Sequence, residues 1–391
     1  MLFKDLSATL IFVVAVIASP TVISRSPVTL ALSRRVNTSS IHNLVRHDQS
    51  RAKELKISRA ASSSDANSFA LRKDAAANVQ ADNQAVIYVA SINIGTPPTT
   101  CEFILLNEVQ YGSGQFFGNE VFDAVTLTPD LIIPNQSMGS ALLSQGFSGF
   151  DGILGSVGPT ELTKGTLIPS TDAVIPTVVD NLYNQGLIPA YQLGIYFEAT
   201  DSDQGVSNGE LTFGGTDNSK YDSITYTPVT SVSPASRYWG IDQSLSYGNI
   251  TLLAPGTSGI IDTGTTLILI ATDAYHAYIS ATGAIFDNAT NLLTITIAQY
   301  NNLQDMIFHI GGTDFRLIPD AQIWPRALNA DIGGTADAIY MIVGDLGAFS
   351  GSGLDFINGF AFLERFYSVF DSGNKRVGIA TTAVTTRIVN F

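Results

Sequence analysis

From residue 84 to its end, the chain is a succession of short apolar or alternating runs separated by Gly, Pro, Asn and Ser. Examples are QAVIYVASINIG, DAVTLTPDLIIP, GELTFGG, DSITYTPV and DMIFHIGGTDFRLI. Runs of this length and spacing are typical of β-strands joined by turns, so they predict an all-β body. Two stretches, 175–186 and 272–283, are predicted as helical interruptions. The 391-residue chain is long enough for two lobes that each bury a core.

The first 18 residues differ from this body. They contain an eleven-residue apolar run, Ala8 to Ala18, in which Val16 and Ala18 have the spacing of a cleavage site. The run is too short to span a membrane. We predict a signal peptide at 1–18 and a secreted, extracellular protein that has no contact with a membrane once the signal is removed. Delivery to a vacuole is an alternative destination, and an unusual terminus without a targeting role is an alternative interpretation.

Charge divides the remaining chain into two parts. Residues 19–80 carry 10 Lys and Arg against 4 Asp and Glu, a net charge of +6, whereas residues 81–391 carry 9 against 29, a net charge of −20. A basic, Ser- and Ala-rich segment before an acidic body predicts a removable pro-segment that neutralises the body it covers. A disordered linker is the alternative. The acidic body argues against nucleic acid as a partner, because nothing after residue 80 would neutralise phosphates.

Several kinds of chemistry have little support in the composition. Cys101 is the only cysteine, so the chain forms no internal disulfide. The acidic body contains two histidines, His276 and His309, and no Cys/His cluster. We therefore expect no metal, no cofactor and no Ser-His or Cys-His catalysis, and we interpret an isolated histidine in such a body as structural.

The stretch GIIDTGTTLILI, residues 259–270, places Asp262 between two apolar runs. Burying a carboxylate is costly unless other groups bond or use it. Gly264 allows a tight turn whose backbone N–H groups can reach the carboxylate, and Thr263 and Thr265 add hydroxyls to a local network. The motif predicts a functional acid, although an ordinary turn aspartate at the end of a strand would give the same tripeptide.

The order of further motifs resembles the pepsin-like aspartic endopeptidases, most closely their polyporopepsin-like secreted group. The matching segments are ALSRRVNTSSIHNLV, INIGTPPTT, VQYGSGQFFG, GFDGILG, GELTFGG, YWGIDQSLSYG, GIIDTGTTLILI, AQIWP and FLERFYSVFD. The resemblance implies a bilobal fold, with an N-terminal lobe at 81–195 and a C-terminal lobe at 196–391. It also implies a monomer that acts on protein or peptide substrates.

In this family two aspartates, one from each lobe, share one proton and activate a water that attacks the peptide carbonyl. The resemblance makes Asp262 the second-lobe acid. Thr263 would bond across the lobe interface, Gly264 would donate its backbone N–H, and Thr265 would orient the carboxylate. The substrate-covering flap would carry three residues: Tyr111, Gly112 and Ser113.

The first-lobe acid is missing. The position where it belongs is Leu106, and the chain contains no second Asp-Thr-Gly and no Asp-Ser-Gly. The two lobes also differ in spacing: 97 positions separate Asp262 from Gly359, whereas 46 separate Leu106 from Gly152, the two glycines being those expected to pack against the active-site turns. We therefore predict an N-terminal lobe truncated by several dozen residues. Four other acids are rejected as substitutes: Glu108, Asp123, Asp130 and Asp151.

The sequence predicts an aspartic-type endopeptidase by family, whose activity as printed is in doubt because one acid is absent. Sequence loss by mis-splicing or mis-assembly is our preferred explanation. The alternative is a non-catalytic protein of the pepsin fold that binds peptides or inhibits a protease. In a third interpretation two chains pair, and each contributes its Asp262 to one catalytic pair.

Overall fold

The structure is a computed structural model of the whole chain, and it describes residues 26–36, 44–57, 86–106, 115–145, 151–155, 174–200 and 206–390. The predicted signal peptide lies outside these residues, and the predicted pro-segment is described only in part. Strands dominate the described chain, which confirms the predicted all-β body. None of the helices within these ranges has the length and apolar character needed to cross a bilayer.

Both predicted helical interruptions are present. The first is α3 (Val178–Asn184), which begins with a capping box in which the Thr177 hydroxyl accepts from the Asp180 N–H and the Asp180 carboxylate accepts from the Thr177 N–H. The second is α4 (Thr272–Thr282), which ends at Gly283 in the left-handed conformation, with φ of 69°.

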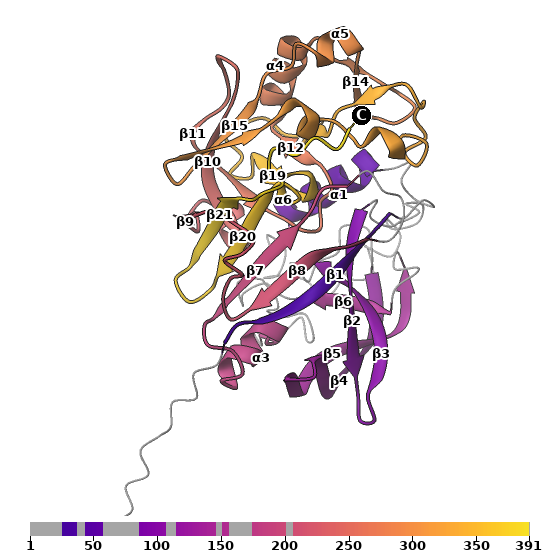
Figure 1. Cartoon of the computed structure of the whole chain (residues 1–391), viewed down its shortest axis with the longest axis vertical. Coiled ribbons are helices and arrows are strands. Elements are labelled where there is room, and N and C mark those ends of the chain that lie inside the picture. Colours follow the sequence, from indigo (N-terminus) through magenta and orange to yellow (C-terminus); the bar gives the residue numbers. More distant parts are fainter. Residues whose placement is uncertain are drawn as a thin grey trace, which may run out of the picture.

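An eleven-stranded sheet joins the two ends of the body. Its main path is β5 (Leu131–Gln145), β4 (Gln115–Thr128), β2 (Val86–Ile94), β1 (Val28–Val36), β8 (Val206–Phe213), β7 (Gln192–Phe197), β20 (Phe366–Asp371), β21 (Arg376–Thr381) and β9 (Ile224–Pro228). Off this path, β3 (Thr99–Leu106) pairs with β2 and with β6 (Gly152–Gly155). In Figure 1 strands β2 to β6 form the lower part of the molecule, and β1, β7 and β8 lie between them and the C-terminal elements above.

A seven-stranded sheet forms most of the C-terminal lobe. Its order is β16 (Thr313–Leu317), β15 (Met306–Ile310), β10 (Gly240–Tyr247), β11 (Ile250–Ile261), β19 (Phe356–Asn358), β12 (Ile268–Ile270) and β18 (Val343–Asp345). A third sheet contains β13 (Ile285–Phe286), β14 (Leu293–Ile295) and β17 (Ile339–Tyr340). The remaining helical elements are α1 (Leu44–Ile57), α5 (Ile297–Tyr300), α6 (Phe360–Leu363), η3 (Ala235–Arg237), η4 (Pro319–Gln322) and η5 (Arg326–Leu328).

The core of the C-terminal lobe is aromatic. Phe362 contacts Phe308 and Phe366, with ring centroids 5.0 and 4.7 Å apart, and Phe315 packs edge-on against Phe366. All four side chains are fully buried or nearly so, and burying each contributes about 1.5–3 kcal/mol. Phe362 belongs to α6, so this packing holds that helix against the turn that carries Asp262, where the Phe360 N–H donates to the Thr265 carbonyl at 2.8 Å.

Each lobe has a parallel strand pair at a corresponding place, and the C-terminal lobe has a second such pair, β12 with β18. In the C-terminal lobe β11 runs beside β19, with Ile260 opposite Ile357 and Ile261 opposite Asn358. In the N-terminal lobe β3 runs beside β6, and Leu106 is opposite Gly155. One residue beyond the paired positions of the C-terminal lobe come Asp262 and Gly359. Leu106 and Gly155 are therefore the equivalents of Asp262 and Gly359.

This register corrects one sequence prediction. Gly152 is not the equivalent of Gly359, because it lies opposite Phe103, three positions before Leu106. The equivalent glycine is Gly155, which lies opposite Leu106. The error arose because the segment GFDGILG offers more than one glycine to align with the single glycine of DFINGFAF, and only strand pairing selects one.

The far end of the N-terminal lobe is incompletely covered. Strand β4 pairs with β2 at only two positions near its end, Asn93 with Thr126 and Ile94 with Val125. In the part of β4 that pairs with β5 but not with β2, Phe122 is 59% exposed, and Leu142 on β5 is 65% exposed. Large apolar side chains at an open strand edge are what removal of covering chain would leave.

Candidate active site

The Asp262 carboxylate lies at the end of β11 and is buried, with 2% of the residue exposed. Its Oδ1 accepts from the Gly264 N–H at 2.9 Å, and its Oδ2 accepts from the Thr265 hydroxyl at 2.6 Å. The Asp262 N–H donates to the Asn358 carbonyl at 3.1 Å, which ties the turn to β19. The motif residues thus form a network around one buried carboxylate.

A basic side chain from the predicted pro-segment completes this network. Arg51 on α1 donates from Nε to Oδ2 of Asp262 at 2.7 Å and from Nη2 to Oδ1 at 2.9 Å. Both side chains are almost fully buried. This two-point contact is the geometry in which an arginine binds a carboxylate most strongly.

The pKa of Asp262 follows from these contacts. Burial, the largest influence, would by itself raise the pKa of the carboxyl. The charge of Arg51, its hydrogen bonds and those of Thr265 and Gly264 act in the opposite direction and outweigh burial. The pKa of Asp262 is therefore below its ordinary value, and the carboxylate is held ionised.

A second acid from α1 binds the same turn. The Asp48 carboxylate is fully buried and accepts from the Thr266 N–H at 3.1 Å and from the Leu267 N–H at 2.8 Å. Glycine at position 264 is required for this arrangement, because a Cβ there would lie 2.4 Å from Nη2 and 2.5 Å from Cζ of Arg51. The sequence analysis missed Asp48 and Arg51; the signal that could have found them is a charged pair at i and i+3 within a basic segment.

Helix α1 presents one continuous face to the body. Its buried residues recur every three or four positions: Leu44, Val45, Asp48, Arg51, Ala52 and Leu55. Hydrogen bonds add to this contact: the Tyr238 hydroxyl donates to the Leu55 carbonyl at 2.9 Å near the C-terminal end of the helix, and the Gln49 amide donates to the Asp345 carbonyl at 3.0 Å near its middle. The helix therefore covers the Asp262 turn as part of the folded structure.

Thr263 differs from its neighbours. It is fully buried, yet its hydroxyl has no hydrogen-bond partner among the residues that the structure describes. A buried hydroxyl without a partner costs about 1–3 kcal/mol. The sequence analysis assigned this hydroxyl a bond across the lobe interface, to a turn that this chain lacks.

The glycines opposite the two turn positions have different surroundings. A Cβ on Gly359 would lie 2.3 Å from the Thr265 carbonyl oxygen and 2.4 Å from that of Leu267, so this glycine lets the Asp262 turn pack closely. At Gly155 no described atom lies within 4 Å of the corresponding position. The turn that would pack there is the one predicted to be missing.

We expect Gly359→Ala to reduce the free energy of unfolding by about 1–3 kcal/mol, because the added methyl meets backbone carbonyls that cannot rotate away. Gly155→Ala in the chain as printed is the matched control and should change it by less than about 0.5 kcal/mol. Urea unfolding followed by tryptophan fluorescence measures both. Equal effects of the two variants would contradict the assignment of a packed turn at only one glycine.

The other candidate residues from the sequence are either outside the described residues or exposed. Tyr111, Gly112 and Ser113 lie outside the described residues, as does the rejected substitute Glu108. The three remaining candidates are exposed, unlike the buried Asp262: Asp123, Asp130 and Asp151. Among the described residues, no group of three or more His, Cys, Asp or Glu side chains is placed to hold a metal ion.

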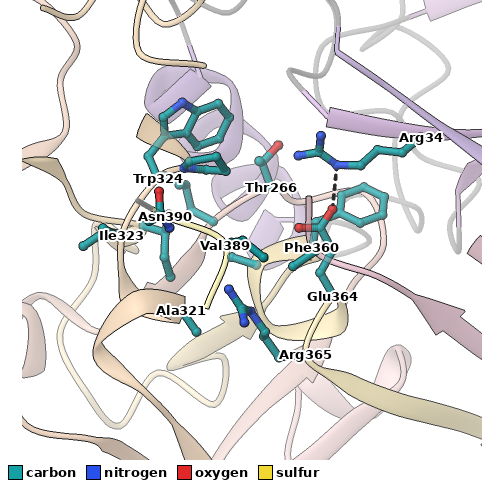
Figure 2. A pocket seen from close by; sticks show the side chains of 15 residues that line it. Arg34, Thr266, Ala321, Ile323, Trp324, Phe360, Glu364, Arg365, Val389 and Asn390 are labelled. Atoms are coloured by element: carbon teal, nitrogen blue, oxygen red, sulfur yellow. Dashed lines mark hydrogen bonds and ion pairs between the residues drawn. The ribbon is translucent and has the colours of Figure 1, made fainter. Parts of the chain in front are cut away.

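A pocket of about 490 Å³, counting the part that is open to solvent, lies beside the turn. Thr266 and Leu267 form part of its wall, and Trp324 lies at one end (Figure 2). At the other end Arg34 of β1 donates to the Glu364 carboxylate at 2.8 Å. The predicted pro-segment thus contributes a buried ion pair here as well as at Asp262.

The fold and the turn define a class. Two β lobes, each with a parallel strand pair that ends at a glycine, and a buried Asp-Thr-Gly-Thr turn in one of them are the features of a pepsin-like acid protease. The comparison with known proteins agrees with this class.

The chain matches the family described as eukaryotic aspartyl protease over residues 106–382. It is 53% identical over 343 residues to polyporopepsin from Irpex lacteus, an alignment that covers 81% of this chain and 100% of that protein. It is 31% identical over 283 residues to gastricsin from Homo sapiens, covering 70% of this chain and 66% of gastricsin. The crystal structure of the aspartic proteinase from Irpex lacteus is similar with a TM-score of 0.75 and 53% identity, covering 78% of this chain and 96% of that chain. The chain therefore belongs to the eukaryotic aspartyl protease family and has its bilobal fold.

The alignment with polyporopepsin also measures a shortfall. The alignment is 343 residues long. It covers 81% of the 391 residues of this chain, which is about 317 residues. About 26 aligned positions therefore have no residue in this chain. The family match begins at residue 106, which is the position where the sequence predicts the loss. These 26 positions are fewer than the difference between the two lobe spacings in the sequence, 97 and 46 positions. The two lobes therefore also differ in length for another reason.

Proposed function

We propose that this chain is the pro-form of a secreted, acid-active aspartic endopeptidase that has lost the segment carrying its first catalytic aspartate, and that Asp262 is the remaining catalytic acid. Its parts are a signal peptide at 1–18, a basic pro-segment at 19–80, a truncated N-terminal lobe at 81–195 and a C-terminal lobe at 196–391. The observation that supports the proposal is the buried Asp262 carboxylate, which accepts hydrogen bonds from Gly264 and Thr265 in a protein with the fold of the aspartyl protease family.

The chemistry requires two acids. An ionised carboxylate removes a proton from the attacking water while a protonated carboxyl supplies one to the carbonyl oxygen of the scissile bond. Gly264 and Thr265 favour the ionised form of Asp262 by donating to it, so this side chain suits the role of base. The proton donor would come from the first-lobe turn. One carboxylate cannot fill both roles in the same step, so the chain as printed should not turn over peptides.

The pro-segment would keep the enzyme inactive before maturation. Arg51 occupies both oxygens of Asp262, so no water can be activated there. Asp48 occupies the N–H groups of Thr266 and Leu267, which are then not available to a peptide. Removal of the segment would expose the turn, and the basic charge of the segment suits the acidic body that it covers.

One observation favours the binding alternative for the chain as printed. Two adjacent backbone donors, those of Thr266 and Leu267, hold a carboxylate in a buried site. Without its pro-segment, such a site could hold the backbone of a peptide without cutting it. Pairing of two chains through Asp262 is disfavoured while α1 covers this residue, and we propose a monomer.

Restoring the lost segment tests the proposal. The segment of polyporopepsin that aligns between Leu105 and Tyr111 is inserted, and the protein is expressed with its pro-segment and matured in acid. We expect the restored protein to cleave acid-unfolded proteins at some pH between about 2 and 6, and the printed chain to show no cleavage above background. Cleavage is measured as release of acid-soluble peptides.

The controls separate the possible outcomes. The same insert with its own Asp-Thr-Gly changed to Asn-Thr-Gly should restore the fold without the activity. A folded, matured and inactive restored protein would overturn the endopeptidase proposal. Peptide binding by the printed chain without turnover would then support the binding alternative.

A further inference from the structure

The outer face of the seven-stranded sheet carries a polar row that is separate from the Asp262 site. Strands β16, β15 and β10 are neighbours, and their residues alternate between the core and the surface. The core side holds Leu245, Phe308 and Phe315, all buried. The surface side holds Ser246, His309 and Asp314 from the same three strands.

The strand register brings these three side chains together. His309 on β15 is directly opposite Asp314 on β16, and it is opposite Ser244 on β10, two residues before Ser246. The His309 Nδ1 lies 2.6 Å from Asp314 Oδ1, and the Ser246 Oγ lies 3.0 Å from His309 Nε2. A hydroxyl, an imidazole and a carboxylate therefore form one hydrogen-bonded chain.

The carboxylate determines which ring nitrogen carries the proton. Ionised Asp314 can only accept, so Nδ1 of His309 must donate to it. In the neutral ring Nε2 is then unprotonated and accepts from the Ser246 O–H. This is the arrangement in which a histidine acts as general base toward a serine nucleophile, and it is identified by geometry and not by sequence order.

We propose that Ser246, His309 and Asp314 form a second, serine-type site that reacts with small activated acyl esters. Ser246 is the nucleophile, His309 is the base, and Asp314 is a positioning residue that fixes the tautomer of His309. The site is independent of Asp262, which lies buried at the end of β11 under α1.

The reaction is an ordinary acyl transfer. The Ser246 Oγ bonds to the acyl carbon while its proton passes to His309 Nε2. The bond from the acyl carbon to the leaving oxygen then breaks, and Nε2 returns the proton to that oxygen. Water, deprotonated by the same nitrogen, attacks the acyl-serine and releases the acid, so that the serine is regenerated with no oxidant or further reactant.

The exposure of the site sets its substrate class. The His309 side chain is 37% exposed and the Asp314 side chain 64% exposed, so substrates are met on an open face. The backbone of β10 is engaged with β11 and β15, so it offers few N–H groups to a developing oxyanion. Esters with good leaving groups fit such a site, since they need little oxyanion stabilisation, whereas peptide bonds do not.

The reaction should require neutral His309, because a protonated ring cannot accept from Ser246. Other charged groups on this face are Asp242 on β10 and Arg316 on β16, and Arg316 donates to the Asp305 carboxylate at 2.6 Å. Acid that protonates the ring should therefore abolish the reaction, whereas aspartic peptidases work in acid, and this difference separates the two sites.

The test uses the full chain with Asp262→Asn, so that no aspartic chemistry contributes. 4-Nitrophenyl acetate measures turnover, and a fluorophosphonate probe followed by mass spectrometry measures covalent labelling. We expect labelling on the peptide that contains Ser246 and a hydrolysis rate about 10²-fold or more above that of Ser246→Ala, the scale of general base catalysis. His309→Gln should match Ser246→Ala, and Asp314→Asn should lower the rate and change its pH profile.

Ser244→Ala is the matched control, because it removes a hydroxyl from the same face of the same strand and should leave the rate within about twofold. Thermal unfolding verifies that each variant folds. Hydrolysis by Ser246→Ala equal to that of its parent, or labelling that does not depend on His309, would overturn the proposal. The row would then be a hydrogen-bonded surface that only stabilises the sheet.

Discussion

Asp262→Asn in the chain with its lost segment restored is expected to reduce peptide hydrolysis by about 10³–10⁴-fold at every acid pH. The amide has nearly the same shape: its oxygen can still accept from the Gly264 N–H, and its NH2 group can donate to the Thr265 hydroxyl, so the turn should survive. It cannot take up a proton from water at any pH used, and this is the reason for the loss. The initial rate of cleavage of an acid-unfolded protein measures the effect.

Asp123→Asn is the matched control for this variant. Asp123 is an exposed acid of the N-terminal lobe whose carboxylate accepts from the neighbouring Ala124 N–H at 2.8 Å. It should retain activity within about twofold. Comparable losses in the two variants would show that acids outside the turn carry the chemistry, and Asp262 would lose its assigned role.

Arg51→Leu is expected to destabilise the docked pro-segment by about 3–5 kcal/mol at pH 7, because it leaves the Asp262 carboxylate buried without its partner. The full chain should unfold at lower urea concentration, and the segment around α1 should become cleavable by a neutral protease. Lys53→Leu removes one positive charge from the exposed side of the same helix and is the control. If Arg51→Leu and the parent chain resisted the protease equally, Arg51 would not be the residue that holds the pro-segment on the body.

The same contact predicts how docking depends on pH. The pKa of Asp262 is lowered in the docked form, so its contribution is complete above the ordinary aspartate pKa of about 3.9 and is lost as the pH falls through the lowered value. The urea midpoint of the parent chain should therefore decrease on acidification below about pH 4. In Arg51→Leu the charge and hydrogen bonds of Arg51 no longer oppose burial, and only the bonds from Thr265 and Gly264 still lower the pKa of Asp262, so this pH dependence should weaken or reverse.

Much of the fold could be predicted from local pattern. The short runs, the helices at α3 and α4 and the glycine that ends α4 are signals within a few residues of the chain. The Asp262 turn could also be predicted, because the two groups that donate to its carboxylate, the Gly264 N–H and the Thr265 hydroxyl, lie within three positions of it. Features of this kind depend on sequence neighbours alone.

The remaining site residues could not be predicted because strand register and helix docking bring them together. Arg51 meets Asp262 across 211 positions of sequence, and Asp48 meets Thr266 across 218. Ser246 and His309 are 63 positions apart, so His309 read as an isolated histidine until β10 and β15 were paired. The misassigned glycine had the same cause, since only the pairing of Leu106 with Gly155 fixes the alignment of the lobes.

That pairing has a practical consequence. The C-terminal end of β3 and the Gly155 end of β6 lie side by side as parallel neighbours, with Leu106 opposite Gly155. The segment that we propose to be missing would follow Leu106, so the strand pair that would support its turn is already formed. The N-terminal lobe can then be rebuilt by inserting the segment at one junction, and the surrounding strands need no redesign.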